Sequence, residues 1–347
     1  MTDTIDNNTL LEVENLKIAF KTDEGLLQAV AGVSFSVQRA KVLGIVGESG
    51  SGKSVSTRAI MRLLANNAVI DPASKILLHK ANGKVVDVSK MNPRGKEIRE
   101  IRGNEVSMIF QEPMRSFSPV YTIGNQITEA IRAHQKVDKR EARKMGISML
   151  DRVGISNPAR RFDQYPFELS GGMRQRAMIA VALSANPALL IADEPTTALD
   201  VTIQAQILQL MKELQKDFGM AIIFITHDLG VISQIADDVV VMYLGQILET
   251  GTVRDVVKNP KHPYTQSLLK AIPKIEALDK RLVPVGGDIP TLLARPTGCP
   301  FHPRCQQYIQ GHCEHNEIYP ITLSETHSVN CFLYEEGLKH ESASTES

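Results

Sequence analysis

The sequence lacks the features that mark membrane-spanning or secreted chains. Nowhere do eighteen apolar residues run together, and the first ten residues, MTDTIDNNTL, contain neither the basic nor the apolar segment of a signal peptide. The 39 basic residues are balanced by 39 acidic residues, so no net charge draws the chain toward nucleic acid or anionic lipid. We therefore expect a protein of the cytosol, with room for two or three domains in 347 residues.

Cysteine is scarce, and its distribution is uneven. The four cysteines, Cys299, Cys305, Cys313 and Cys331, all lie in the last fifty residues of the sequence. In a reducing compartment, cysteines gathered in this way favour metal binding over disulfide bonds.

The stretch VLGIVGESGSGKSVSTR passes from an apolar run to a glycine-rich turn that ends in GKS. Gly47, Gly50 and Gly52 allow backbone conformations in which successive N–H groups converge on a phosphate. Lys53 can then reach the β- and γ-phosphates, and the Ser54 hydroxyl can bind Mg²⁺. A plain turn between strand and helix need not carry this pattern. The stretch therefore predicts a binding site for a nucleoside triphosphate.

Two kinds of hydrophobic pattern predict an α/β fold. Before the loop, residues 11–20 and 33–37 alternate apolar and polar side chains, as half-buried antiparallel strands do. After it, the short apolar runs 189–192, 221–225 and 239–242 are typical of a parallel sheet buried on both faces. Helical patterns between these runs complete the signs of a parallel nucleotide-binding core.

Smaller signals fill in the rest of the predicted core. A helix is expected to continue after the loop through Leu64, and Asn82-Gly83 between two apolar runs predicts a hairpin. Charged helical sequence from Met91 to about Tyr165 interrupts the core pattern. We therefore expect a helical subdomain inserted at about residues 92–165.

Polar side chains stand where several of the predicted strands end. One apolar run ends in Asp193-Glu194, Gln111 follows another, and His227 follows a third. One carboxylate of the pair can hold Mg²⁺ while the next lies beside an attacking water. The segment LSGGMRQR precedes these carboxylates, and Ala198-Leu199-Asp200 follows them.

In this order and spacing, the motifs resemble those of the ATP-binding subunits of ABC transporters, over about residues 11–255. The resemblance implies a P-loop NTPase core in residues 1–255 with an antiparallel β subdomain and the inserted helical subdomain. It also implies hydrolysis of ATP to ADP and phosphate. Two such subunits would close face to face on two ATP molecules.

The resemblance also implies roles for single residues. Glu194 would be the general base, His227 the switch histidine and Gln111 the glutamine that senses the metal and the water. Mg²⁺ would be held by Ser54, Gln111 and Asp193. The residues expected to bind nucleotide are Phe20, which would stack on adenine, and Gly47, Glu48, Ser49, Gly50, Ser51, Gly52, Lys53, Ser54, Val55, Gln111, Ser170, Gly171, Gly172, Asp193 and Asp200.

Ser170, Gly171 and Gly172 match the family motif that caps the γ-phosphate held by the opposing subunit. Met173 stands where many family members have glutamine, which leaves open any contact made by that side chain.

A narrower resemblance covers the C-terminal part. NPKHPYTQSLL (Asn259–Leu269), PTGCPFHPRC (Pro296–Cys305) and FQEPMRSFSPVYTIGNQI (Phe110–Ile127) are similar to segments of oligopeptide/dipeptide importer ATPases. This implies a C-terminal extension at residues 256–347 and peptides as the cargo. Related importers carry nickel or oligosaccharides, and both remain alternatives.

The resemblance further implies partners and a location. The partners would be a second ATPase subunit in a heterodimer, two transmembrane permease subunits and an extracytoplasmic solute-binding protein. The chain would lie peripherally on the cytoplasmic face of the inner membrane, without nucleic acid.

Two other classes of protein share the phosphate loop. ABC ATPases that act on nucleic acid carry a long coiled coil or two cassettes, whereas this chain has one cassette and no net charge. A soluble P-loop kinase would have no use for LSGGM or for Asp200.

The cysteine spacing C-x5-C-x7-C-x17-C, with His302 near the first two, leaves the nature of the metal open. Four thiolates suit zinc or an iron–sulfur cluster, and four unligated buried thiols are the third possibility. Some peptide importer ATPases carry a [4Fe-4S] cluster at cysteines so placed, and this resemblance implies a structural cluster on Cys299, Cys305, Cys313 and Cys331.

Overall fold

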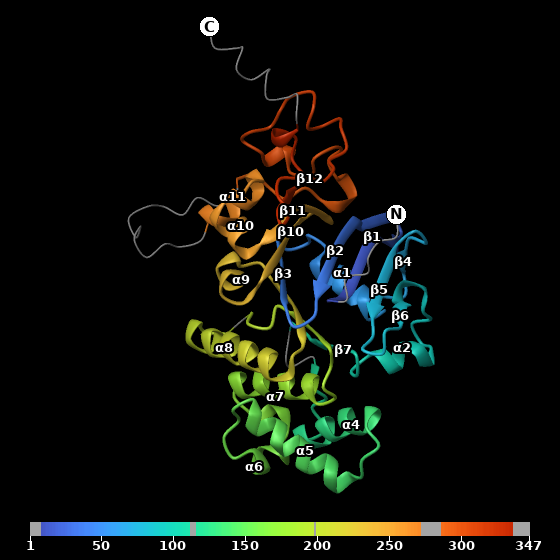
Figure 1. The fold of residues 1–347 in the computed structure, drawn as a ribbon, viewed down its shortest axis with the longest axis vertical. Helices are drawn as coiled ribbons and strands as arrows, with labels where there is room; N and C mark the ends of the chain where they lie inside the picture. The colour runs from blue at the N-terminus through green and yellow to red at the C-terminus, as the bar shows by residue number, and fades with distance from the viewer. Residues whose placement is uncertain (1–7, 112–115, 198, 272–285, 336–347) are drawn as a thin grey trace.

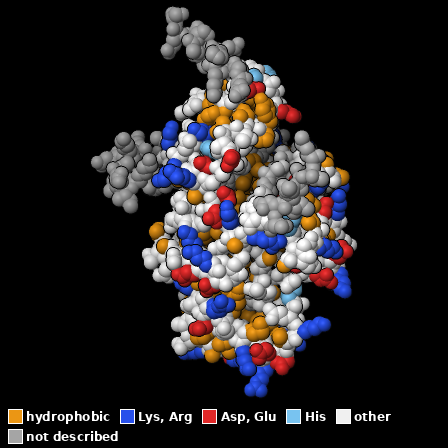
Figure 2. Space-filling model, viewed as in Figure 1, with side chains coloured by type: hydrophobic (Ala, Val, Ile, Leu, Met, Phe, Trp, Pro, Cys, Tyr) orange, Lys and Arg blue, Asp and Glu red, His pale blue; other side chains and the backbone are white. Residues whose placement is uncertain are grey.

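The computed structural model describes residues 8–111, 116–197, 199–271 and 286–335 of the chain. Figure 1 shows an elongated molecule with a sheet-rich core in the middle, a group of helices at one end and the C-terminal segment at the other. On the face shown in Figure 2, acidic and basic side chains are interspersed, in keeping with the zero net charge.

An antiparallel sheet is built from the first segments of the chain. Its strands pair in the order β2 (Gly25–Gln38), β1 (Thr9–Thr22), β5 (Lys75–His79) and β6 (Val85–Asp87), with β4 (Ala68–Ile70) also on β1. The prediction of antiparallel strands here is confirmed, since Val13 of β1 lies opposite Phe35 of β2. The predicted hairpin is confirmed too: β5 and β6 are antiparallel, and Gly83 between them takes a φ of 78°.

The second sheet forms the core of the molecule. Its order is β12 (Ile321–Thr322), β13 (Ser328–Val329), β11 (Gln246–Thr252), β10 (Asp238–Tyr243), β3 (Val42–Val46), β9 (Ala221–Thr226), β8 (Leu189–Asp193) and β7 (Val106–Ile109). The strands from β10 through β7 are parallel, as the continuous apolar runs predict. Parallel strands bring their carboxyl ends to one edge, which is where ligands bind in such sheets.

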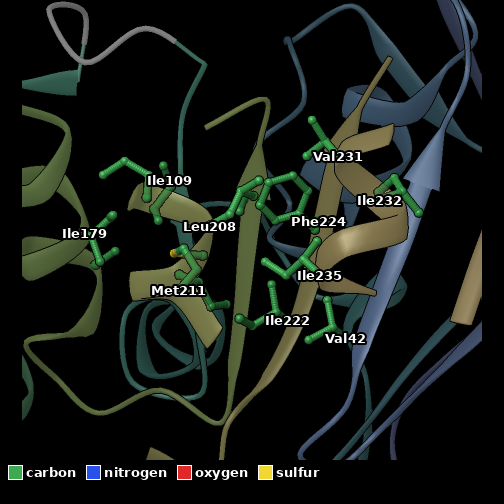
Figure 3. Packing of buried hydrophobic residues seen from close by; sticks show 14 of the residues in the cluster. Val42, Ile109, Ile179, Leu208, Met211, Ile222, Phe224, Val231, Ile232 and Ile235 are labelled. Atoms are coloured by element: carbon green, nitrogen blue, oxygen red, sulfur yellow. The ribbon is translucent and has the colours of Figure 1, made fainter. Parts of the chain in front are cut away.

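Helices connect these strands and cover their faces. They are α1 (Lys53–Ile60), α2 (Lys96–Ile101), α4 (Ile123–His134), α5 (Lys139–Arg152), α6 (Pro158–Phe162), α7 (Gly171–Leu183), α8 (Val201–Phe218), α9 (Leu229–Ile235), α10 (Val253–Lys258) and α11 (Pro263–Lys270), with 3-10 turns η1 (Val88–Lys90), η2 (Pro166–Glu168), η4 (Leu292–Ala294), η5 (His302–Arg304) and η6 (Phe332–Tyr334). Figure 3 shows Ile179 of α7, Met211 of α8 and Phe224 of β9 among the side chains of one buried apolar cluster.

The helical end of the molecule consists of α4, α5 and α6. Phe162 of α6 fits between two glycines: a Cβ on Gly124 of α4 would overlap its ring, and a Cβ on Gly146 of α5 would lie 2.6 Å from it. The segment predicted as inserted, at about 92–165, also contains α2 and β7, and β7 pairs with β8 in the core sheet.

The C-terminal segment joins the core sheet through β13, which pairs antiparallel with β11. A buried carboxylate fixes this junction. Glu249 of β11 accepts hydrogen bonds from His327 Nε2 at 2.8 Å and from the backbone N–H groups of Lys261 and His262 at 2.7 and 2.9 Å. Full burial of a carboxylate requires such partners.

Among the helices that the structure describes, none combines the length and the apolar character needed to span a bilayer.

Candidate active site

The loop between β3 and α1 requires glycine for steric reasons. Gly50 and Gly52 have φ values of 78° and 92°, which side chains disfavour. A Cβ on Gly47 would overlap the carbonyl oxygen of Met242, and one on Gly52 would lie 2.8 Å from the carbonyl oxygen of Ala29. Helix α1 then begins without a side-chain cap. The first N–H groups of α1 are therefore available to an anion.

Lys53 is held inside this loop. Its side chain is buried, and Nζ donates hydrogen bonds to the carbonyl oxygens of Gly47 at 2.7 Å and Glu48 at 2.9 Å and to Ser51 Oγ at 3.2 Å. Burial lowers the pKa of Lys53, although nearby carboxylates oppose the change. Its partners here are neutral acceptors, which phosphate oxygens can replace.

Asp193 ends β8 next to the start of α1. Its carboxylate is fully buried, accepts a hydrogen bond from Ser54 Oγ at 2.7 Å and lies 3.4 Å from Arg58 Nη2. Burial raises the pKa of Asp193, against the effect of the Ser54 hydrogen bond and the Arg58 charge. Hydroxyl and carboxylate oxygens are ligands that Mg²⁺ prefers, so this pair fits magnesium. Sequence reasoning missed Arg58.

Glu194 lies where three neighbouring strands end. Its Oε2 accepts hydrogen bonds from Gln111 Nε2 at 3.1 Å and from Thr197 Oγ1 at 2.8 Å, and His227 Nδ1 lies 3.7 Å from its Oε1. Its backbone N–H donates to the carbonyl oxygen of Ile225 at 3.0 Å. The structure thus brings together the predicted catalytic residues, and it adds Thr197, which sequence reasoning missed.

The residues of the LSGG motif lie away from the loop. Ser170 caps α7, its Oγ accepting a backbone N–H at 3.4 Å, and Gly171 and Gly172 form the first turn of that helix. Asp200 caps α8 in the same manner, at 2.9 Å. In Figure 1, α7 lies apart from α1, so the LSGG residues and the loop belong to different parts of the chain's fold.

The remaining residues predicted to contact nucleotide differ in how far they are buried. Phe20 and Val55 are partly buried and pack against the apolar cluster between the antiparallel sheet and the core sheet. Ser49 is exposed at the tip of the loop. Residues 112–115 of the Gln111 segment, and Ala198, lie outside the described residues.

Sequence reasoning also missed a contact between the loop and the C-terminal segment. Arg304 donates to both carboxylate oxygens of Glu48, at 2.7 and 3.1 Å, and the hydroxyl of Tyr264 accepts from the Glu48 N–H at 2.9 Å. Tyr264 lies in Asn259–Leu269 and Arg304 in Pro296–Cys305, the two C-terminal segments that resemble peptide importer ATPases. Nothing in the sequence alone pairs positions 256 residues apart.

The iron–sulfur prediction is wrong. Within the described ranges, which include all four cysteines, no group of three or more His, Cys, Asp or Glu side chains is arranged to hold a metal ion. Burial, with a smaller contribution from neighbouring thiols, raises the pKa of Cys299 and Cys331 to about 12. Burial also raises the pKa of Cys305 and Cys313.

Comparisons with known proteins show which families the chain resembles. Residues 30–197 match the ABC transporter family, and residues 248–313 match the C-terminal region of the oligopeptide/dipeptide transporter family. A putative peptide import ATP-binding protein of Brucella abortus is 46% identical over 334 residues, which cover 94% of this chain and 98% of that protein. The dipeptide transport ATP-binding protein DppD of Bacillus subtilis is 46% identical over 333 residues, 95% of this chain and 96% of that protein. None of these names describes an iron–sulfur protein.

Solved structures share the fold of the core. A dimeric ATP-binding cassette in a post-hydrolysis state, bound to ADP and phosphate, is 24% identical, with a TM-score of 0.61 over 71% of this chain and 99% of that chain. The cbiO1 protein of Clostridium perfringens, part of the ABC transporter complex cbiONQ, is 27% identical, with a TM-score of 0.60 over 73% of this chain and 92% of that chain.

Proposed function

Because this chain belongs to the ABC transporter family, as an ATP-binding subunit similar to those of peptide importers over most of its length, we propose that it hydrolyses ATP to drive peptide uptake. The observation that carries the proposal is the meeting of the phosphate loop with the Glu194 group at one edge of the core sheet. The names of the relatives support peptides as the cargo and do not favour nickel, oligosaccharides or nucleic acid.

The chemistry follows from the side chains at this edge. Lys53 and the free N–H groups of α1 bind the phosphates and stabilise the charge that develops on the transferred phosphoryl group. Ser54, Asp193 and Gln111 would hold Mg²⁺, which would neutralise phosphate charge. Glu194 orients a water molecule and accepts its proton.

His227 and Gln111 position Glu194, to which both lie close. Phe20, on β1 of the antiparallel sheet, stacks on the adenine ring.

In this proposal, the chain works as one subunit of a transporter rather than alone. Two ATPase subunits, this chain and a related partner, close on two ATP molecules. Residues 1–255 supply the ATPase, with its helical insertion, and residues 256–347 form an extension. Closure moves two transmembrane permeases that receive peptide from an extracytoplasmic binding protein. The chain then sits peripherally on the cytoplasmic face of the membrane.

The test is to isolate the complex from native membranes through an affinity tag on this chain and to identify the permeases and binding protein that accompany it. The complex is then reconstituted in vesicles containing ATP. Peptide uptake that requires ATP and disappears with Glu194→Gln supports the proposal. Uptake of nickel or an oligosaccharide in place of peptide would overturn the peptide assignment, and co-purification of nucleic acid without permeases would overturn the transporter assignment.

A further inference from the structure

The C-terminal segment reaches the phosphate loop through Arg304. Its guanidinium group donates to both carboxylate oxygens of Glu48, at 2.7 and 3.1 Å, in the bidentate geometry that makes such pairs strong. The same group donates to the Tyr243 hydroxyl at 3.1 Å. The side chain of Arg304 is only 3% exposed and that of Glu48 21% exposed. Solvent therefore screens this ion pair much less than it screens a surface pair.

An aromatic cluster fixes Arg304 from three parts of the chain. Tyr243 ends β10, Tyr264 lies in α11 and Phe301 precedes η5, and their ring centroids are 4.8 to 5.5 Å apart. All three side chains are buried. The guanidinium carbon lies 5.7 Å from the Tyr243 ring and 5.8 Å from the Phe301 ring.

Burial acts to lower the pKa of Arg304, but the hydrogen bonds to Glu48 and Tyr243 outweigh it and raise the pKa above its ordinary value. The position and charge of the guanidinium group are thus both fixed.

Glu48 connects Arg304 and Tyr264 to the groups of the loop that would contact phosphate. Its carbonyl oxygen accepts from Lys53 Nζ at 2.9 Å and from the N–H of Ser51 at 3.2 Å. Its own N–H donates to the Tyr264 hydroxyl at 2.9 Å. The C-terminal segment therefore holds the Glu48 side chain and α11 holds the Glu48 backbone, and the Glu48 carbonyl in turn sets where Lys53 lies.

Charge gives a second reason for the contact. The Glu48 carboxylate lies within electrostatic reach of Lys53, so an uncompensated charge there would repel the phosphates that Lys53 attracts. Arg304 neutralises that charge.

We infer that Arg304 and Tyr264 are positioning residues for nucleotide binding, which act through Glu48 to hold the phosphate loop in its binding conformation. This inference rests on the proposed ATPase function. It gives the C-terminal part of the chain a role in the ATP site that the motifs Asn259–Leu269 and Pro296–Cys305 did not indicate.

Isothermal titration of the full-length chain with Mg-ATP tests the inference. Because small misplacements of binding groups are costly, Arg304→Gln should weaken Mg-ATP binding by roughly 10- to 100-fold. Adding Glu48→Gln to that variant removes the unpaired carboxylate and should restore about tenfold of the loss. Arg254→Gln, at an exposed arginine of α10, is the matched control and should bind as the unmodified chain does.

Tyr264→Phe is a second, milder variant. It keeps the ring in the aromatic cluster but leaves the partly buried Glu48 N–H without its acceptor, and it should weaken Mg-ATP binding by roughly five- to tenfold. Thermal melting of each variant establishes that it is folded.

If the double variant binds no better than Arg304→Gln, or if Tyr264→Phe binds normally, the inference is overturned while ATP binding itself stands. If the unmodified chain fails to bind Mg-ATP, the proposed function fails instead.

Discussion

At the scale of single residues, Glu194 shows a conformation that its neighbours must hold in place. Its φ of 47° lies in the left-handed region, which is costly for a residue with a side chain. The hydrogen bonds from Gln111 and Thr197 and the bond from its own N–H to Ile225 fix this conformation. This backbone conformation places the carboxylate at the edge of the core sheet where the phosphate loop lies.

Replacing Glu194 by glutamine tests its role as general base. The amide keeps an oxygen for Gln111 and Thr197 but cannot accept a proton, so turnover of ATP in the assembled transporter should fall by roughly 10²-fold or more. Mg-ATP binding should persist. Glu213→Gln, at an exposed carboxylate of α8, serves as the control. Full turnover by the Glu194 variant would remove this residue from the mechanism.

His262 makes the fold sensitive to acid. It is fully buried, its Nδ1 accepts the N–H of Tyr264 at 3.0 Å, and burial lowers its pKa from 6.5 to about 3. Between these values the unfolded chain binds a proton that the folded chain does not. The stability contribution of His262 is therefore present above pH 6.5 and is lost as the pH falls toward 3.

We expect about 2 kcal/mol of stability to be lost through His262 between pH 7 and pH 5. His262→Asn retains an acceptor at the start of α11, so it should unfold more easily at pH 7 but lose less stability on acidification. Urea unfolding of both proteins at the two pH values measures the difference. Parallel losses would show that His262 does not titrate in this way.

The sequence alone predicted many of the residues that the structure brings together in the candidate site. The glycines of the loop, Lys53 and Glu194 belong to short motifs whose residue types indicate phosphate binding or proton transfer. Thr197 and Arg304 could not be identified, because their partners are set by the folded chain. The cysteine prediction failed for a related reason: spacing shows how many thiols a segment has but not whether the described fold arranges them around one metal ion.

At the scale of elements, the periodicity of apolar residues predicted which segments form strands and helices, but it did not predict the residues at which they end. The helix after the phosphate loop was expected to reach Leu64 but ends at Ile60, where Arg62 takes a φ of 53°. The N–H groups of Arg62 and Leu63 bond back to Ala59 and Arg58, which closes the helix. The two-residue strands β12 and β13 left no pattern in the sequence, since they are strands only because β13 pairs with β11 and β12 pairs with β13.

Packing of α4, α5 and α6 depends on the absence of side chains at two positions. Gly124→Ala would place a methyl group against the Phe162 ring and its backbone. The gain in helix propensity, about 1 kcal/mol, should be smaller than the cost of overpacking, about 1–3 kcal/mol. The variant should therefore be less stable by thermal melting, and Phe162→Leu added to it should recover part of the loss. Unchanged or higher stability of Gly124→Ala would contradict this account of the packing.

At the scale of the whole molecule, the proposal makes the ATP site of this chain half of a larger arrangement. One end of the core sheet carries the phosphate loop and Glu194, while Ser170 and its glycines lie on a separate surface at the start of α7. In the proposed arrangement, this second surface serves the nucleotide of another subunit. Face-to-face closure of two subunits would place each LSGG motif over the nucleotide of the other.

Ser170→Arg tests this arrangement. Ser170 is exposed, and an arginine there adds bulk and positive charge to the face that must approach the partner, while the phosphate loop is untouched. ATP-driven closure with the partner subunit, followed by cross-linking in the Glu194→Gln background, should be lost. Loss of the helix cap should cost only about 1 kcal/mol of stability. Ser148→Arg, which adds the same group to exposed α5, should close normally.

The affinity of the isolated Ser170→Arg chain for Mg-ATP distinguishes action on the partner from action within one chain. If the motif serves the partner's nucleotide, this affinity should equal that of the unmodified chain, because the altered surface is separate from the chain's own loop. A matching loss of affinity in the isolated subunit would mean that the motif contacts the nucleotide of its own chain. The two-subunit arrangement proposed here would then be wrong, and the hydrolytic role of Glu194 would have to be explained within a single chain.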